Sequence, residues 1–165
     1  MRIFLIGFMG SGKTTAGKKL AKKAGFSFLD MDKEIEKKHN LKVGQIFEER
    51  GEEIFRQFER DMLHEITVKD DMVVSTGGGV PCYYDNMEFM NNNGITVYLR
   101  LDPSSLVKRL EEAKTDRPLI KDRNHQQLIE YVTSKLAERE EYYNQASHVI
   151  DARNLKISTL LELLR

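Results

Sequence analysis

The sequence predicts an α/β/α sandwich of three layers, with five mainly parallel strands between two layers of helices. Short apolar runs alternate with segments of helical period along the whole chain, which is the main reason for this prediction. The length of 165 residues is typical of one domain. No repeat, linker or low-complexity tract divides the chain. We therefore expect residues 1–165 to form a single domain.

The first strand is expected over residues 3–6, an apolar run that ends at Gly7 as buried parallel strands do. A helix over 13–24 follows. Its apolar residues include Leu20, and its other side carries Lys18, Lys19, Lys22 and Lys23. A nucleic-acid patch and a solvated helix face both explain such lysines. The balanced charge of the whole chain favours the solvated face.

A second strand over 26–30 precedes two short helices, over 31–39 and 43–50. The next helix, over 52–68, is predicted from apolar residues at three- and four-residue spacing. These residues are Ile54, Phe55, Phe58, Met62 and Ile66. The third strand, over 72–76, ends at a run of three glycines.

The second half continues the alternation of helices and strands. A helix near 84–92 leads through Asn93-Gly94 into a fourth strand over 95–101. Asp102-Pro103 is a helix-start signal, because proline suits the first helical turn. The polar stretch 114–123 is expected to be a mobile loop. A long helix over 124–143, a fifth strand over 148–151 and a last helix over 157–164 complete the chain.

Composition excludes several classes of protein. Lys and Arg total 26 and Asp and Glu total 26, so the chain lacks the basic excess of proteins that hold DNA or RNA. Hydrophobic residues make up 40% and charged residues 32%, which fits neither a disordered chain nor a membrane protein. Cys82 is the single cysteine, so no internal disulfide forms and a reducing compartment is expected. We expect a cytoplasmic monomer that binds neither nucleic acid nor membrane.

Residues 7–14, Gly-Phe-Met-Gly-Ser-Gly-Lys-Thr, fit the phosphate-loop pattern G-x-x-x-x-G-K-[ST]. They follow a predicted strand and open a predicted helix, the context that the pattern requires. Glycines let backbone N–H groups surround phosphate oxygens, and the helix N-terminus adds positive charge. We therefore expect nucleoside triphosphate binding, with Lys13 at the β- and γ-phosphates and the Thr14 hydroxyl on Mg²⁺. The nucleotide-binding residues would be Gly10, Ser11, Gly12, Lys13, Thr14 and Thr15.

Asp30 and Asp32 lie two residues apart at the end of the second strand, so both side chains should point to one side. Carboxyl ends of parallel strands line the ligand crevice of open α/β sheets. One carboxylate would then lie near Mg²⁺ while the other accepts a hydrogen bond from a substrate hydroxyl. The alternative is a helix N-cap, a common role of aspartate at a helix start.

Gly77-Gly78-Gly79 follows a buried strand, which indicates either a tight turn or a close approach of the backbone to a ligand or to a helix. Arg56 and Arg139 lie on predicted helices. Each suits an ordinary ion pair, which for Arg56 would involve Glu53 or Glu59, or a site for an anion. Arg117, beside Pro118, is either a solvated charge or a lid arginine that reaches the transferred phosphoryl group. The four histidines lack the spacing of metal ligands.

Six stretches of the chain resemble the shikimate kinase family, small P-loop kinases of the aromatic amino-acid pathway. They are GFMGSGKTT (7–15), FLDMD (28–32), EEIFRQFE (52–59), STGGGV (75–80), DRPLI (116–120) and LAEREEYYNQA (136–146). Each stretch alone is only suggestive, but six in the family's order are specific. The resemblance covers essentially the whole chain and implies a P-loop fold with a lid.

The resemblance implies transfer of the ATP γ-phosphoryl group to the 3-hydroxyl of shikimate. In that family the aspartate matching Asp32 holds the substrate's hydroxyls, and arginines matching Arg56 and Arg139 bind its carboxylate. The middle glycine of the triplet, here Gly78, contacts the substrate through its backbone. The substrate-binding segment would cover about 31–60. The implied substrate-binding residues are Asp32, Arg56, Gly77, Gly78, Gly79 and Arg139.

The resemblance also assigns the nucleotide and metal residues. The aspartate matching Asp30 lies near Mg²⁺ through water, beside Thr14. The arginine matching Arg117 belongs to a lid, here about 112–124, that closes over ATP. We assign Arg109 and Arg153 to the nucleotide side of the site. The catalytic residues would be Lys13, Asp32 and Arg117, with Lys13 and Arg117 neutralising the transferred group.

The chain departs from the family's pattern after Arg139. Family members often have a proline shortly after that arginine, where this chain has Glu140-Glu141. The alignment of Tyr142 and Tyr143 with the family's pattern therefore stays open by one residue. As in the family, Ser75-Thr76 stands where many P-loop enzymes have a metal-orienting acid, which moves the expected metal role to Asp30.

Two other functions fit parts of the pattern. A gluconate kinase-like enzyme would also take a substrate with a carboxylate and hydroxyls, but the aspartate pair, the glycine triplet and both arginines favour shikimate. A nucleotide-gated switch would carry a base-reading Asn-Lys-x-Asp motif, which this sequence lacks. A kinase-like protein without activity is disfavoured because every expected catalytic position is filled.

Overall fold

Five parallel strands form the central sheet of the computed structural model, which describes residues 1–113, 120 and 122–165. The strands are β1 (Arg2–Ile6), β2 (Ser27–Asp30), β3 (Met72–Ser75), β4 (Ile95–Arg100) and β5 (His148–Asp151). They lie in the order β2-β3-β1-β4-β5, and each neighbouring pair is parallel. The predicted five-stranded parallel sheet is confirmed. The strand order, which the sequence did not predict, places β1 in the centre.

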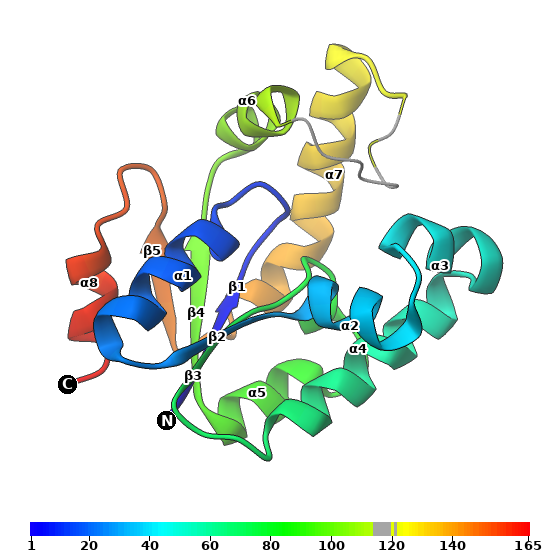
Figure 1. The fold of residues 1–165 in the computed structure, drawn as a ribbon. Coiled ribbons are helices and arrows are strands. Elements are labelled where there is room, and N and C mark those ends of the chain that lie inside the picture. The colour runs from blue at the N-terminus through cyan, green and yellow to red at the C-terminus, as the bar shows by residue number, and fades with distance from the viewer. Residues whose placement is uncertain (114–119, 121) are drawn as a thin grey trace.

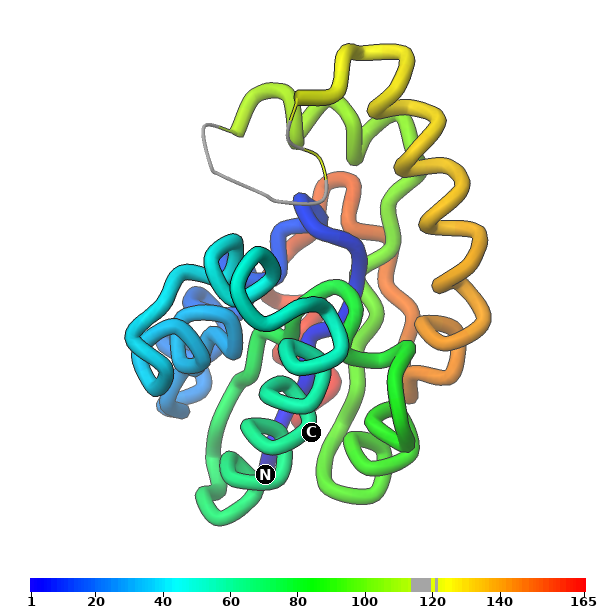
Figure 2. Tube along the Cα trace, turned by 90° about the vertical axis from the view of Figure 1, so that its right-hand side faces the viewer, coloured from blue at the N-terminus to red at the C-terminus, as the bar shows by residue number. Residues whose placement is uncertain are grey.

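Helices cover both faces of this sheet, as predicted for a three-layer sandwich (Figure 1). They are α1 (Lys13–Ala24), α2 (Met31–His39), α3 (Val43–Arg50), α4 (Glu52–Ile66), α5 (Asn86–Asn93), α6 (Pro103–Glu112), α7 (His125–Tyr143) and α8 (Ile157–Glu162). Figure 2 shows α4, α5 and α7 in front of the sheet, whereas α1 and α8 pack together on its other face.

The strands in the middle of the sheet are the most buried. All four residues of β3 are buried, as are residues 3–6 of β1. Such strands read as continuous apolar runs because helices cover both of their faces. Ligands of open α/β sheets bind outside the carboxyl ends of the strands, where the chain order reverses. Here that point lies beyond β1, where Figure 1 shows the following loop between α6 and α7 on one side and α2 to α4 on the other.

The predicted elements match the observed ones closely, with one exception before α5. A short 3₁₀ turn, Val80–Cys82, follows the glycine triplet, and α5 begins at Asn86 rather than near residue 84. Tyr84 has a φ of 51°, which is a left-handed conformation that a right-handed helix cannot include. The helix-start signal at Asp102 is confirmed, because its carboxylate accepts a hydrogen bond from the Ser105 N–H at 3.0 Å.

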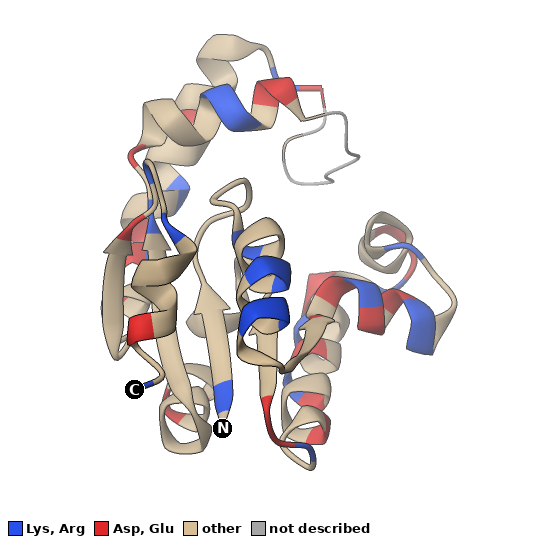
Figure 3. Ribbon diagram, turned by 60° about the vertical axis from the view of Figure 1, so that its left-hand side comes forward, with Lys and Arg blue, Asp and Glu red and all other residues tan. Residues whose placement is uncertain are grey.

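Charged residues of the helices lie mainly on the outside of the sandwich. Lys18, Lys19, Lys22 and Lys23 of α1 are all exposed, and Figure 3 shows basic residues on the outer side of this helix. This exposure is compatible with both interpretations of these lysines, so the solvated face stays a prediction. In the described part of the chain, no helix is both long enough and apolar enough to cross a membrane.

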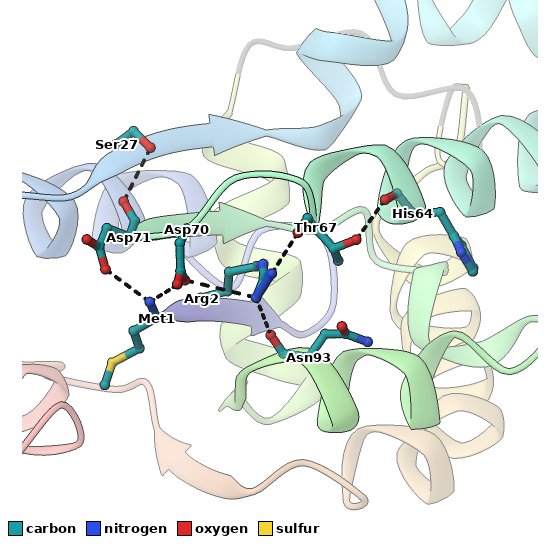
Figure 4. Close-up of polar contacts among 8 residues, drawn as sticks. All are labelled: Met1, Arg2, Ser27, His64, Thr67, Asp70, Asp71 and Asn93. Carbon is teal, nitrogen blue, oxygen red and sulfur yellow. Dashed lines mark hydrogen bonds and ion pairs between the residues drawn. The ribbon is translucent and has the colours of Figure 1, made fainter.

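Arg2 joins two helix ends at the amino edge of the sheet, far from the carboxyl ends of the strands (Figure 4). Its guanidinium donates to the carbonyl oxygen of Thr67 at 2.6 Å and to that of Asn93 at 3.1 Å. These carbonyls lie at the C-terminal ends of α4 and α5, where cations stabilise helices. The amino group of Met1 binds the carboxylate of Asp71 nearby at 3.0 Å.

We expect Arg2→Ala to lower the free energy of unfolding by about 1–3 kcal/mol, because it leaves two partly buried carbonyls without a donor. Urea denaturation of both proteins measures this difference. Turnover should stay unchanged, since Arg2 lies at the opposite edge of the sheet from the phosphate loop. A loss of turnover in a folded Arg2→Ala protein would contradict this placement.

Candidate active site

The phosphate loop connects the central strand β1 to the N-terminus of α1. Gly10 and Gly12 adopt positive φ angles of 84° and 95°, which side chains rarely tolerate. Gly12 is also the N-cap of α1, with no side-chain hydrogen bond at that position. The backbone N–H groups of the first helical turn are therefore directed toward the loop, where an anion would bind.

Lys13 places its ammonium group inside this loop. The side chain is buried, and Nζ donates to the carbonyl oxygen of Gly7 at 2.7 Å and to that of Phe8 at 3.0 Å. These bonds keep a positive charge within the curve of the loop. The predicted position of Lys13 at the phosphate groups agrees with this geometry.

Thr14 and Asp30 bring two oxygen ligands together. The Thr14 hydroxyl donates to Oδ2 of Asp30 at 3.0 Å and lies 3.4 Å from the Ser75 hydroxyl. Oxygen ligands of this kind suit Mg²⁺, so these residues fit the predicted metal site. Asp30 also caps α2, since Oδ1 accepts a hydrogen bond from the Lys33 N–H at 3.3 Å. A position near the metal and a role as helix N-cap are therefore compatible for Asp30.

Asp32 reaches the same cavity for a reason that differs from the prediction. We expected Asp30 and Asp32 to share one side of a strand, but Asp32 lies in the first turn of α2. The chain turns at Asp30, the N-cap, and this turn directs both carboxylates toward the carboxyl end of the sheet. Both residues line one cavity with Gly77.

The glycine triplet is required for space and not for backbone conformation. None of Gly77, Gly78 and Gly79 has a positive φ. A Cβ on Gly77 would lie 2.7 Å from Oε2 of Glu59 and 3.1 Å from Oδ1 of Asp32. These distances are too short for a side chain, so the triplet lets charged groups approach the backbone closely.

Gly79 is at least as enclosed as Gly77, and Gly78 is less so. A Cβ on Gly78 would lie 3.2 Å from Nη1 of Arg139, and one on Gly79 would overlap Nη1 of Arg56. The structure thus brings the predicted substrate-side residues together around the triplet. Residues 77–80 also form a turn, closed by a hydrogen bond from the Val80 N–H to the Gly77 carbonyl oxygen at 3.1 Å, so a turn and a close approach both describe this segment.

Arg56 lies on the buried side of α4 and forms two ion pairs. Nη1 donates to Glu59 at 2.7 Å and Nη2 donates to Glu52 at 3.1 Å. The expected pairing with Glu59 is confirmed, whereas Glu52 takes the place that we considered for Glu53. The Nε atom is buried without a hydrogen-bond partner among the described residues. A buried N–H donor in this state suits an anionic ligand.

Arg139 presents a second buried donor. Its side chain in α7 is buried, and Nη1 has no hydrogen-bond partner in the described part of the chain. Tyr143, one turn later, is fully buried, and its hydroxyl donates to the carbonyl oxygen of Gly78 at 2.6 Å. This bond identifies Tyr143 as the tyrosine that faces the glycine triplet. It also holds the glycine triplet against α7.

One cavity of about 360 Å³ joins the phosphate loop to the acceptor side. Its lining comes from the loop, the start of α2 and the segment after β3. The residues from our predicted site are Gly10, Gly12, Lys13, Thr14, Thr15, Asp30, Asp32, Gly77, Gly78 and Arg109. A nucleotide phosphate and an acceptor hydroxyl could therefore meet in a single space.

Comparison with known proteins identifies the family to which this arrangement corresponds. The family model for shikimate kinase matches residues 9–164. The chain belongs to the shikimate kinase family. A shikimate kinase of Parabacteroides distasonis is 51% identical over 154 residues, which cover 93% of this chain and 89% of the relative. Membership makes the chain an ATP-dependent kinase, as predicted.

Solved structures of the shikimate kinase family agree with this assignment. The enzyme of Bacteroides thetaiotaomicron superposes with a TM-score of 0.95 at 44% identity, over 99% of this chain and 98% of that one. The Acinetobacter baumannii enzyme in complex with shikimate gives a TM-score of 0.89 at 36% identity, over 99% and 92% of the two chains. A gluconokinase of Sinorhizobium meliloti, at 14% identity and a TM-score of 0.60, shares the fold alone.

The arginines assigned to the nucleotide differ in their placement. Arg109 donates to the carbonyl oxygen of Ser11 at 3.2 Å, so it lies directly beside the phosphate loop. Arg153 is exposed and pairs with Asp151 at 2.8 Å, and it lines a separate cavity rather than the one at the loop. Arg117, with most of the predicted lid at 112–124, lies outside the described residues.

The remaining candidates have structural roles. Cys82 is unpaired, and burial raises the pKa of its thiol to about 11, so it is a poor nucleophile at neutral pH. His39 stacks on Phe58 and His64 stacks on Phe89. No group of three or more potential metal-binding His, Cys, Asp or Glu residues occurs within the described ranges.

Glu59 is a further candidate residue of the site, which the sequence identified only as a partner of Arg56. It is almost completely buried, beside Arg56 and the glycine triplet. The sequence does contain a signal, since Glu59 follows Phe55 by four residues and precedes Met62 by three on the apolar side of α4. A carboxylate at such a position must have a buried partner.

Burial raises the pKa of Glu59 from 4.5 to about 7, although Arg56 opposes this shift. Between these pH values the folded protein keeps a proton that the unfolded chain releases. The free energy of unfolding should therefore fall as pH rises from about 4.5 to 7, by at most about 3 kcal/mol from this group.

Urea denaturation of the wild type and Glu59→Gln at several pH values in this range tests the effect. The Glu59→Gln variant, which has no group to titrate at this position, should show a smaller decrease. Equal pH dependence of the two proteins would contradict the raised pKa of Glu59.

Proposed function

We propose that this chain transfers the γ-phosphoryl group of ATP to the 3-hydroxyl of shikimate, giving shikimate 3-phosphate and ADP. The observation that carries this proposal is the cavity that joins the phosphate loop to Asp32 and Gly78. Two buried arginines, Arg56 and Arg139, flank the same glycine segment. A phosphate loop alone would suit many nucleotide enzymes. The arginines add a site for a carboxylate, and Asp32 adds an acceptor for hydroxyl groups.

On the nucleotide side, this chain's main task is to position and neutralise the phosphates. The backbone N–H groups at the start of α1 and the ammonium of Lys13 would bind the β- and γ-phosphates. Lys13 would leave its carbonyl partners, or share its protons with them, as the phosphates enter the loop. Arg109 would contact the nucleotide beyond the phosphates, because it lies against the loop at Ser11.

Thr14 and Asp30 would hold Mg²⁺, Thr14 directly and Asp30 through water. Their adjacent oxygen atoms are the support for this assignment. When bound, the ion reduces the negative charge that repels an attacking hydroxyl. Because Asp30 also caps α2, the same carboxylate would connect the metal site to the first turn that carries Asp32.

On the acceptor side, Arg56 and Arg139 would bind the carboxylate of shikimate while Asp32 accepts a hydrogen bond from its hydroxyls. Two fixed points of this kind set both the position and the orientation of the ring. Asp32 would orient the attacking oxygen and accept its proton as the new P–O bond forms. A loose transition state needs little deprotonation beforehand, so orientation is the larger part of this role.

We further propose that the enzyme acts as a monomer in the cytoplasm. The single cysteine is unpaired, which suits a reducing compartment. Size-exclusion chromatography with light scattering would measure the mass of the protein in solution. A lid arginine at Arg117 stays a prediction of the sequence.

Measurement of ADP release with Mg²⁺ and ATP, with and without shikimate, tests the proposed reaction. We expect turnover that depends on shikimate and a product whose phosphate is attached at the 3-position, as assigned by phosphorus and proton NMR. Gluconate serves as the comparison acceptor. Equal turnover with gluconate, or slow ATP hydrolysis that no small acid accelerates, would contradict the proposal.

A further inference from the structure

Arg56 lies against an aromatic ring that directly follows the 3₁₀ turn Val80–Cys82. Its guanidinium carbon is 4.4 Å from the centroid of the Tyr83 ring. The corresponding distances to Phe55 and Phe47 are 5.5 Å and 6.0 Å, so Tyr83 forms the closest of these aromatic contacts. A cation at this distance from a ring face is attracted by the electrons of the ring.

The hydroxyl of Tyr83 extends the contact to a second partner of Arg56. It donates to Oε1 of Glu52 at 3.0 Å, and the same oxygen accepts a hydrogen bond from Nη2 of Arg56 at 3.1 Å. Tyr83 therefore contacts both the guanidinium and the carboxylate that binds it. The side chains of Tyr83, Arg56 and Glu52 therefore each contact the other two, on the outer side of the glycine triplet.

This arrangement addresses a difficulty in binding an anionic substrate. Arg56 is already paired with Glu52 and Glu59, and both carboxylates compete with the carboxylate of a substrate. A ring face stabilises the guanidinium without occupying any of its N–H donors. The hydroxyl bond to Glu52 satisfies part of the charge on that carboxylate, which weakens its competition for Arg56.

We infer that Tyr83 is a positioning residue for the substrate carboxylate, acting by holding the guanidinium of Arg56 in its binding orientation. The inference rests on the proposed function, because it assigns the ligand of Arg56 to that reaction. The Nε of Arg56 has no hydrogen-bond partner among the described residues, so this donor is available to a ligand. Tyr83 itself makes no assigned contact with the substrate.

The chain contains a matched control one residue away. Tyr84 lies over Arg60 at 4.9 Å, and Arg60 is one helical turn after Arg56 in α4. The side chain of Arg60 is 40% exposed and pairs with Asp85. Tyr84→Leu therefore removes the same kind of ring from an arginine that has no assigned role in the site.

Steady-state kinetics of Tyr83→Leu, Tyr83→Phe and Tyr84→Leu test the inference. Tyr83→Leu should raise the KM for shikimate by about three- to thirty-fold, which is the range expected for loss of a partly desolvated cation–π contact. The kcat and the KM for ATP should stay within about two-fold of wild type, because the loss concerns ground-state binding. Tyr83→Phe keeps the ring and should restore most of the affinity, and Tyr84→Leu should leave every constant unchanged.

The methyl ester of shikimate separates positioning from a general structural effect. The ester has no negative charge for Arg56 to bind, so Tyr83→Leu should not change its KM. An equal increase for shikimate and its ester, or a loss of kcat with unchanged KM, would overturn the inference. An unchanged KM for shikimate in Tyr83→Leu would overturn it as well.

The wild type distinguishes failure of this inference from failure of the proposed function. Wild-type turnover that does not depend on shikimate would overturn both. Shikimate-dependent turnover with no effect of Tyr83→Leu would overturn the role of Tyr83 alone. Tyr83→Met provides a second variant of similar bulk without a ring, and it should reproduce the KM of Tyr83→Leu. Thermal melting verifies that each variant is folded before its kinetics are compared.

Discussion

Replacing Lys13 with alanine should lower kcat by about a hundred- to a thousand-fold, the range found when a single group that stabilises transition-state charge is removed. Lys13 is the buried cation of the phosphate loop, with its ammonium between the carbonyl oxygens of Gly7 and Phe8. The other lysines of α1 are exposed and do not line the cavity at the loop, so none of them can replace this charge. Shikimate-dependent ADP release under saturating substrates measures the loss.

Lys18→Ala is the matched control for this substitution. Lys18 lies on the same helix, but its side chain is exposed to solvent. We expect its turnover to equal that of the wild type, and circular dichroism should show both variants folded. Near-normal turnover of Lys13→Ala would contradict the assignment of residues 7–14 as the phosphate loop.

Arg139→Ala should raise the KM for shikimate much more than it lowers kcat. Removing one partner of a buried, charged hydrogen bond costs about 2–5 kcal/mol, which corresponds to about thirty- to five-thousand-fold in affinity. Arg139 is buried beside Gly78, and its Nη1 has no other hydrogen-bond partner among the described residues. Isothermal titration with shikimate provides an independent measure of the affinity.

Two further variants test whether the loss of shikimate affinity is specific to the guanidinium of Arg139. Arg139→Lys keeps the charge but loses the planar pair of donors, so it should recover only part of the affinity. Arg60→Ala removes a partly exposed arginine that pairs with Asp85, and it should leave the KM unchanged. An unchanged KM for shikimate in Arg139→Ala would contradict a role of Arg139 in carboxylate binding.

Secondary structure could be predicted from the sequence because it depends on short-range patterns. Helices α1, α2 and α3 begin and end at the predicted residues, and β5 does as well. The start of α5 differs because Tyr84 adopts a left-handed conformation, which side-chain periodicity does not indicate. The strand order also depends on contacts between distant segments, which local patterns do not specify.

The candidate site, too, could be predicted from the sequence only in part. The sequence assigned Asp30 and Asp32 to the carboxyl edge of the sheet, but it derived their common direction from the alternation of side chains along a strand, whereas Asp32 lies in the first turn of α2. The glycine triplet remained ambiguous, since a turn and a close approach use the same residue. Its function as open space becomes evident only when Glu59 and Arg139, from two different helices, are placed against it.

The phosphate loop, the alternation of helices and strands and the family of this chain all follow from its amino-acid order. These features rest on contiguous residues, whose spacing already defines their local geometry. Two contacts became visible only in the folded chain: Tyr143 rather than Tyr142 binds Gly78, and Tyr83 covers the guanidinium of Arg56. Such contacts depend on how whole helices pack on the sheet, and no local pattern encodes the distance between residues that packing brings together.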